Sequence, residues 1–189
     1  MGAAVRGAGG DYINPDELAH DLHAASPGMS VAEANASAWL KGKEQLEQVI
    51  ATRGYYAFET TLGGKTISQL LETAFAAGME VHMRYVGLKS PEQHLARVRA
   101  RVARGGHDIP EAKIRERYDA SRKNLIRLMP RLTSLRVFDN SLEAPPEEGS
   151  TPEPVVLFEV RRGVLQISVQ LDHVPEWAKP LFMAALPKG

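Results

Sequence analysis

The sequence predicts an α/β fold: a parallel sheet flanked by helices, followed by a β-hairpin and a short C-terminal helix. Between residues 55 and 138, strand-like apolar runs alternate with helical patterns. This alternation is typical of a parallel sheet with helices on both faces. Two further apolar runs flank the turn Arg161-Arg162-Gly163, and a helical pattern covers residues 175–186. We interpret residues 1–150 as the core and residues 151–189 as a hairpin and helix of the same domain.

Residues typical of helix ends and strand ends predict the individual helices and strands. Helices are expected over residues 14–25, 30–51, 66–77 and 90–104 and from residue 110 onward, and strands over residues 55–61, 81–88 and 135–138. Asn14 and Ser90 are expected to cap helices that have proline at the first position. Ser30 and Glu33 form a capping-box pattern, and Gly78 suits a helix C-terminus.

Composition excludes several classes of protein. The 189 residues suffice for one domain with a real core, since 43% of them are apolar. There is no cysteine, which excludes disulfides and thiolate zinc sites. We see no secretory signal and no apolar run of about 18 residues, so we expect a cytoplasmic protein without a membrane span. Lys plus Arg and Asp plus Glu are 23 each, which argues against a general nucleic-acid binder.

Arginine is nevertheless concentrated between residues 97 and 136. Arg97, Arg101 and Arg104 recur at helical spacing and therefore share one face of a helix. Phosphoryl transfer needs positive charge over the moving phosphate, so a helical hairpin bent at residues 104–107 could close as an arginine-bearing lid. A solvated basic face or a weak nucleic-acid patch is the alternative.

Polar residues at two element ends are candidates for chemistry. Glu59, Thr60 and Thr61 end a predicted strand, where they either orient a substrate hydroxyl or cap the following helix. Asp16 opens a helix, where it serves either as a partner of the helix dipole, the simpler interpretation, or as a general base. Residues 61–66 resemble half of a phosphate loop, but Glu59 stands where the first glycine is required. We therefore interpret residues 61–66 as a strand-to-helix turn.

Several short motifs, in this order and spacing, resemble the zeta-toxin-like P-loop kinases. They are Asn14-Pro15-Asp16-Glu17, Phe58-Glu59-Thr60-Thr61-Leu62, Arg97-Val98 with Arg101-Val102, Gly105-Gly106-His107 with Pro110, Arg117-Tyr118, and Asp139-Asn140-Ser141. The resemblance covers roughly residues 1–142. It implies a P-loop NTPase-like fold and ATP-dependent phosphoryl transfer to a small-molecule hydroxyl, such as that of a UDP-amino sugar.

The resemblance also implies roles for individual residues. Asp16 resembles the catalytic base. Glu59, Thr60 and Thr61 resemble the substrate-binding strand end, while Arg97, Arg101 and Arg117 resemble the phosphate-binding arginines of the lid. The implied cofactors are ATP and Mg²⁺, with no metal ligand assigned to the chain. The implied partners are the nucleotide and the small-molecule substrate, with an antitoxin or a second copy as further candidates.

One departure from the family concerns the ATP-binding half. A strand and a Walker A loop precede the Asn-Pro-Asp-Glu motif in the family, whereas only 13 residues precede Asn14 here. We therefore expect a chain that is poor at ATP chemistry and marginal, aggregated or oligomeric in isolation, as a fragment of a kinase would be. The alternative is a degenerate, non-catalytic module that binds a nucleotide or a partner.

Overall fold

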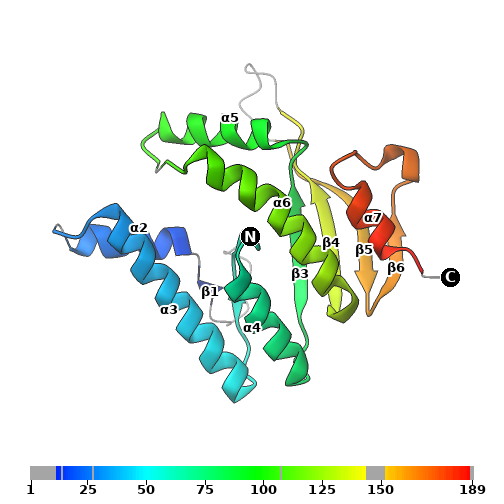
Figure 1. The fold of residues 1–189 in the computed structure, drawn as a ribbon, viewed down its shortest axis with the longest axis horizontal. Coiled ribbons are helices and arrows are strands. Elements are labelled where there is room, and N and C mark those ends of the chain that lie inside the picture. Colours follow the sequence, from blue (N-terminus) through cyan, green and yellow to red (C-terminus); the bar gives the residue numbers. More distant parts are fainter. Residues whose placement is uncertain (1–11, 14, 27, 107, 144–151, 188–189) are drawn as a thin grey trace. The chain divides into compact units, whose positions relative to one another are not determined.

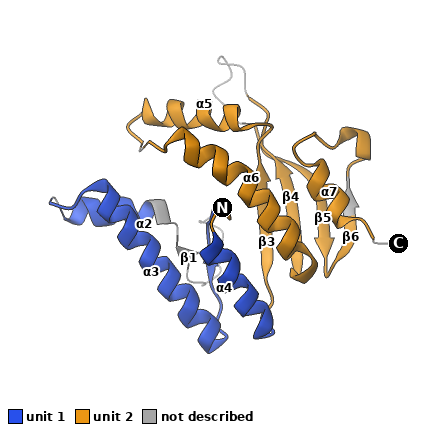
Figure 2. Ribbon diagram, viewed as in Figure 1, with its two compact units in different colours: residues 1–61, 65–79 blue, residues 62–64, 80–189 orange. Residues whose placement is uncertain are grey.

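The computed structural model describes residues 12–13, 15–26, 28–106, 108–143 and 152–187. They form two compact units (Figure 2): residues 1–61 with 65–79, and residues 62–64 with 80–189. We call these unit 1 and unit 2 and describe each by itself. The predicted cap Asn14 and His107 lie outside the described residues.

Unit 1 is mainly helical. It contains β1 (Tyr12–Ile13), α2 (Pro15–Ala25), α3 (Val31–Thr52), β2 (Ala57–Phe58) and α4 (Lys65–Ala76). Helices α2 and α3 pack through the buried side chains of Ala19, Ala34 and Ala38, whose small size lets the two helices approach closely. The capping box is confirmed, because the Ser30 hydroxyl accepts from the Glu33 amide while the Glu33 carboxylate accepts from the Ser30 amide.

The strands of unit 1 are shorter than expected. Strand β2 covers only Ala57–Phe58 of the predicted 55–61 segment, and it pairs in parallel with β1. Tyr55 is 69% exposed, and residues 59–61 are exposed as well, so only the two central residues meet a neighbouring strand. The C-terminus of α4 is confirmed, since Gly78 adopts a left-handed φ of 72°.

Unit 2 is built on a four-stranded sheet (Figure 1). In chain order it contains β3 (His82–Gly87), α5 (Pro91–Val102), α6 (Glu111–Leu128), η1 (Met129–Arg131), β4 (Ser134–Asp139), β5 (Val155–Arg161), β6 (Val164–Ser168), η2 (Leu171–His173) and α7 (Lys179–Ala185). The strand order is β3-β4-β5-β6, with β3 and β4 parallel and the other pairs antiparallel.

The expectation of one parallel sheet is therefore only partly correct. The fold is mixed α/β, but β2 hydrogen-bonds to β1 in a separate pair, and the larger sheet is mixed. The hairpin β5–β6 is confirmed; its turn has positive φ at Arg162 and Gly163, which matches the right-handed twist of the two strands. The last helix begins at Lys179 rather than at residue 175, because Pro175–Ala178 is a turn closed by the Ala178 amide on the Pro175 carbonyl.

Helices α6 and α7 cover the same face of this sheet, as Figure 1 shows. Phe158 of β5 meets Phe182 of α7 edge to face at 5.6 Å, and Leu125 of α6 is fully buried. Within the described ranges, no helix has the length and apolar character needed to cross a bilayer.

Candidate functional site

In unit 1, the parallel pairing of β1 and β2 brings two candidate segments to one edge. Ile13 is opposite Phe58, so both strands end at the same place. Asp16 follows as the second residue of α2, and Glu59-Thr60-Thr61 follows β2 directly and is exposed. The predicted base and the predicted substrate-binding residues therefore share an edge.

In unit 2, the carboxyl ends of β3 and β4 are joined by Gln93, a buried residue of α5. Its Nε2 donates to the Ser141 carbonyl and to Glu143 Oε1, both at 2.8 Å, while its Oε1 accepts from the Lys89 amide at 3.4 Å. Ser90 caps α5 by accepting from the Gln93 amide. The two polar strand ends of unit 2 thus meet, as parallel pairing requires.

Trp177, in the turn before α7, closes the same end of the sheet. Its indole Nε1 donates to Asp139 Oδ1 at 3.2 Å, and Asp139 also accepts from the amide and hydroxyl of Ser141. The ring lies so close to Gly87 that a Cβ there would be 2.1 Å from a ring carbon. A glycine at the end of β3 is therefore required by packing rather than by ligand approach.

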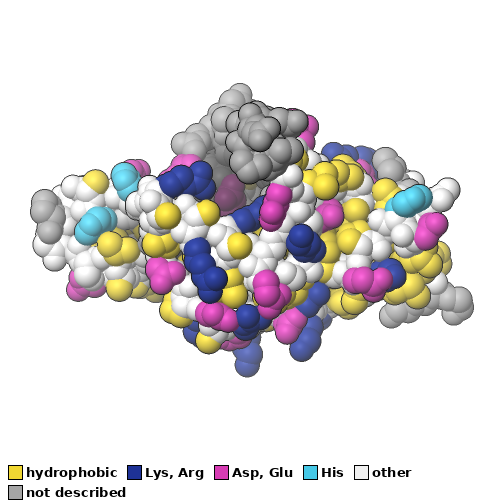
Figure 3. All heavy atoms as spheres, turned by 90° about the horizontal axis from the view of Figure 1, so that it is seen from above, with side chains coloured by type: hydrophobic (Ala, Val, Ile, Leu, Met, Phe, Trp, Pro, Cys, Tyr) yellow, Lys and Arg dark blue, Asp and Glu magenta, His cyan; other side chains and the backbone are white. Residues whose placement is uncertain are grey.

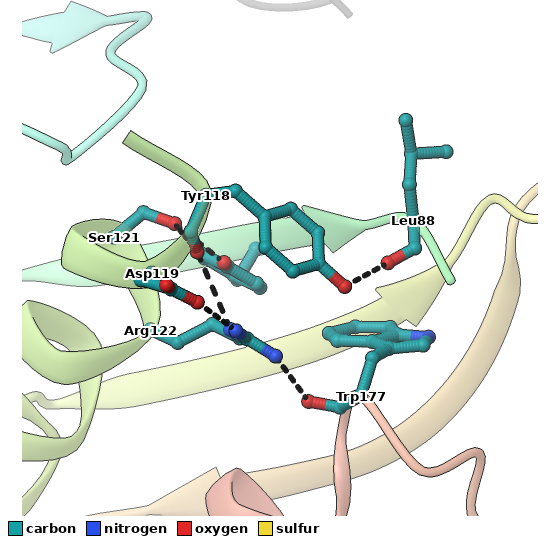
Figure 4. A network of polar contacts seen from close by, with 7 residues as sticks. Leu88, Tyr118, Asp119, Ser121, Arg122 and Trp177 are labelled. Atoms are coloured by element: carbon teal, nitrogen blue, oxygen red, sulfur yellow. Dashed lines mark hydrogen bonds and ion pairs between the residues drawn. The ribbon is translucent and has the colours of Figure 1, made fainter. Parts of the chain in front are cut away.

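Helix α6 is fixed to the sheet by a polar network (Figure 4). The Tyr118 hydroxyl donates to the Leu88 carbonyl at 3.1 Å, and the Arg122 guanidinium stacks on the Tyr118 ring at 4.2 Å. Arg122 also donates to the Trp177 carbonyl and pairs with Asp119. Burial raises the pKa of Tyr118, so its phenol remains a proton donor across the physiological pH range.

The helical hairpin expected for the arginine-rich segment is present. Helices α5 and α6 pack through Leu95, Val98 and Ile114. Arg97, however, points to the main chain after β4: its Nη2 donates to the Asn140 carbonyl at 2.7 Å and to the Leu142 carbonyl at 3.3 Å. In the described state, this predicted phosphate ligand holds α5 to the end of β4.

The other two predicted phosphate ligands differ in their surroundings. The Arg101 side chain packs against the turn at Gly106, where a Cβ would be 2.6 Å from Arg101 Cγ. Arg117 is exposed on α6. His94 lies on the same helix as Arg97 and Arg101, and its pKa is lowered by burial and then by these two cations. A neutral imidazole therefore accompanies the arginines.

The segment Leu62–Gly64 is a turn before α4, as predicted, and it lies on α6. Asn124 Nδ2 donates to the Leu62 carbonyl at 2.8 Å and to the Gly64 carbonyl at 3.4 Å. A Cβ on Gly63 would be 2.9 Å from Arg117 Cβ. Gly63 is therefore explained by close contact with a helix and not by contact with phosphate.

A pocket of about 510 Å³ lies at the opposite, amino end of β3 and β4. It is lined by Glu80, His82, Thr133, Ser134, Arg161 and Arg162. Ligands of α/β sheets bind at the carboxyl ends, so this open pocket is at the less favoured end. On the face drawn in Figure 3, basic and acidic side chains are interspersed, which does not favour a polyanion-binding patch.

The predicted site residues thus fall into two groups. Asp16 and Glu59–Thr61 gather in unit 1, whereas Arg97, Arg101 and Arg117 belong to unit 2. No local pattern singles out Gln93, Asn124 or Trp177, because each bonds to a partner far along the chain.

Comparison with known proteins defines the family of the chain. No protein-family profile matches it, and no solved structure does. A Haemophilus influenzae protein described as uncharacterized is 33% identical over 106 residues, which is 56% of this chain and 73% of that protein. The chain belongs to the same family as this Haemophilus influenzae protein.

Proposed function

We propose that the protein provides the acceptor side of a small-molecule kinase and takes part in ATP-dependent phosphoryl transfer to a hydroxyl such as that of a UDP-amino sugar. The proposal rests on the resemblance to zeta-toxin-like kinases. The structural observation that supports it is the parallel register of β1 and β2, since Asp16 and Glu59 follow paired strands at one edge.

The chemistry assigned to the chain's own residues is limited to the acceptor. The Asp16 carboxylate takes the proton from the attacking hydroxyl and so acts as the general base. Glu59 and Thr60 accept and donate hydrogen bonds that orient the acceptor. Among the predicted lid arginines, Arg117 is exposed on α6 and is therefore accessible to a phosphate.

The residues present do not fit the implied ATP and Mg²⁺. No G-x-x-x-x-G-K-[ST] occurs in the sequence, so the amide cradle for phosphates is lacking. In the part of the chain that the structure describes, no three His, Asp or Glu residues gather as metal ligands. This misfit favours the second candidate, a non-catalytic module that binds a nucleotide or a partner.

Phosphotransfer assays separate the two candidates. The chain, and a version extended into any in-frame upstream coding sequence, are incubated with radiolabelled ATP, Mg²⁺ and UDP-N-acetylglucosamine. We expect the extended version to transfer phosphate to the sugar nucleotide, and Asp16→Asn to lower this rate roughly 10²–10⁴-fold, the usual contribution of a general base. Asp21→Asn, an exposed change on the same helix, is the matched control. Binding of the sugar nucleotide without transfer by either form would reject the kinase and favour the binding module.

A further inference from the structure

The open pocket of unit 2 has a polar lining. Its volume is about 510 Å³, and its six lining residues all belong to unit 2. They are Glu80, His82, Thr133, Ser134, Arg161 and Arg162, and none of the six is apolar. Ligand pockets usually span about 300–1,000 Å³ and are lined mainly by apolar and aromatic side chains. The pocket is therefore large enough for a small metabolite, and its lining suits a ligand that is polar over its whole surface.

The register of the sheet brings three of these side chains into one row. Ser134 of β4 is opposite His82 of β3 on one side and Arg161 of β5 on the other. Side chains of opposite residues in neighbouring strands share a face, and His82 Nδ1 lies 2.8 Å from Ser134 Oγ. Because β5 is antiparallel to β4, the carboxyl end of β5 lies here and contributes Arg161. The preference of ligands for carboxyl ends of strands therefore does not exclude this end of the sheet.

Positive charge exceeds negative charge among the ion pairs at the pocket. The Glu159 carboxylate accepts from Arg161 Nε at 2.7 Å and from Arg136 Nη2 at 2.6 Å, so two guanidiniums share one negative charge. Glu80 Oε1 pairs with Arg162 Nη2 at 3.0 Å. Since Arg161 bonds to Glu159 through Nε, its two terminal nitrogens can donate to a further acceptor. The pocket therefore has the charge and the donors that an anionic ligand needs.

Arg162 occupies a turn position at which other residues are less strained. Its φ is 48°, in the left-handed range, where glycine and asparagine are more favourable than arginine. The turn is fixed beside the pocket, because the Arg162 amide donates to the Thr133 carbonyl at 3.1 Å. Thr133 Oγ1 accepts from the Val81 amide at 3.0 Å, so its own proton can be donated to a ligand. Strained residues cluster at functional sites, and here the strained residue lines a pocket.

We infer that this pocket binds a phosphate monoester of a polyhydroxylated small molecule, that is, a sugar phosphate. The guanidiniums of Arg161 and Arg162 bind the phosphate, since the planar guanidinium matches phosphate oxygens with parallel hydrogen bonds. The hydroxyl of Thr133 and the other polar groups of the lining bind the hydroxyls of the sugar. A nucleobase fits less well, because none of the six lining residues offers it an apolar surface. The site is separate from the proposed acceptor site, which belongs to unit 1.

Calorimetry on the 189-residue chain tests this inference, with glucose 6-phosphate, ribose 5-phosphate, inorganic phosphate and glucose as probes. Arg161→Gln and Arg162→Asn each remove one guanidinium, and asparagine tolerates the left-handed φ of the turn. Glu80→Gln removes the carboxylate that competes with a phosphate for Arg162. Arg99→Gln, an exposed change on α5, is the control for the loss of one positive charge. Circular dichroism establishes that each variant is folded.

We expect the sugar phosphates to bind more tightly than inorganic phosphate, and glucose to bind most weakly. Loss of hydrogen bonds to a charged group corresponds to roughly ten- to a hundredfold in Kd, so Arg161→Gln and Arg162→Asn should each weaken binding by this factor. Glu80→Gln should strengthen binding roughly two- to fivefold, because an exposed ion pair no longer holds Arg162. Arg99→Gln should leave the Kd unchanged.

Three results would overturn the assignment of this pocket. The first is that neither sugar phosphate binds at millimolar concentration. The second is that Arg99→Gln weakens binding as much as the two pocket variants do, since binding would then follow net charge. The third is that inorganic phosphate binds as tightly as the sugar phosphates, since the pocket would then not contact the sugar. If Arg161→Gln does not fold, Arg162→Asn and Glu80→Gln decide, because neither residue bonds to Glu159.

Discussion

Replacing Gly87 with alanine tests the packing at the end of the large sheet. The added methyl would lie 2.1, 2.3 and 2.7 Å from three ring carbons of Trp177. The indole is 4% exposed and donates to Asp139, so it cannot withdraw without giving up this hydrogen bond. Gly87 does not have a left-handed φ, so the whole effect of the substitution on stability comes from the contact with Trp177.

The expected loss in the free energy of unfolding is the sum of two contributions. Overpacking a filled site costs about 1–3 kcal/mol, and loss of the indole hydrogen bond adds about 0.5–1.5 kcal/mol. We expect Gly87→Ala to lower the free energy of unfolding by about 1.5–4.5 kcal/mol. For a chain of this size, each kcal/mol corresponds to about 2–4 °C in Tm.

Urea unfolding followed by circular dichroism provides the assay. This signal does not depend on Trp177, so it can be measured in every variant, including those that lack the indole. In a Trp177→Leu background the obstructing ring is gone, and the cost of Gly87→Ala should largely disappear, which a double-mutant cycle measures as coupling. A loss below about 0.5 kcal/mol for Gly87→Ala at an unchanged m-value would refute the packing argument.

Three further changes test local features. Ser30→Ala removes the cap of α3 and should cost about 0.5–2 kcal/mol in thermal or urea unfolding. Gly42→Ala changes a glycine of the same helix, and nothing lies within 4 Å of the new methyl. It should stabilise the protein by about 0.5–1 kcal/mol. Glu159, whose pKa is lowered by hydrogen bonds from Arg161 and Arg136, stabilises the fold above its unfolded pKa and loses this contribution as pH falls through its folded value. Glu159→Gln should therefore flatten the fall in stability below about pH 4.5.

Each of these three predictions has an outcome that would contradict it. The prediction for Ser30→Ala is wrong if the unfolding curve of this variant coincides with that of the wild type. Ser30→Asp is the control and should retain stability, because aspartate also caps helices. A Tm below that of the wild type would contradict the prediction for Gly42→Ala. A fall in stability with pH as steep as that of the wild type would contradict the prediction for Glu159→Gln, and Glu153→Gln is the exposed control.

Local signals predicted most of the helices and their ends. Ser30 with Glu33, Ser90 with Pro91, and Gly78 each act within a few residues of themselves, and the structure confirms all three. The turn at Arg162 and Gly163 was likewise readable from its neighbours. The candidate residues Asp16 and Glu59 were found from the resemblance and from their place at element ends.

Contacts between distant segments were not predictable in this way. Which strands pair was misjudged, because a two-residue strand carries too weak a pattern to show that β2 joins β1 and not the larger sheet. The role of Arg97 as a donor to the Asn140 carbonyl was also hidden, since an arginine on a helix face looks the same whether it meets a ligand or the main chain.

Most of the helices, the caps Ser30 and Ser90, the hairpin and the turn at Leu62–Gly64 could be predicted from local sequence, because they depend on hydrogen bonds and φ values within a few residues. The need for glycine at positions 63 and 87 is visible only in the folded chain, since the obstructing atoms belong to Arg117 and Trp177, far along the chain. The same is true of Asn124, whose hydrogen bonds to the Leu62 and Gly64 carbonyls can form only when α6 packs on the turn. Burial and contact are properties of the folded chain, and no local pattern encodes them.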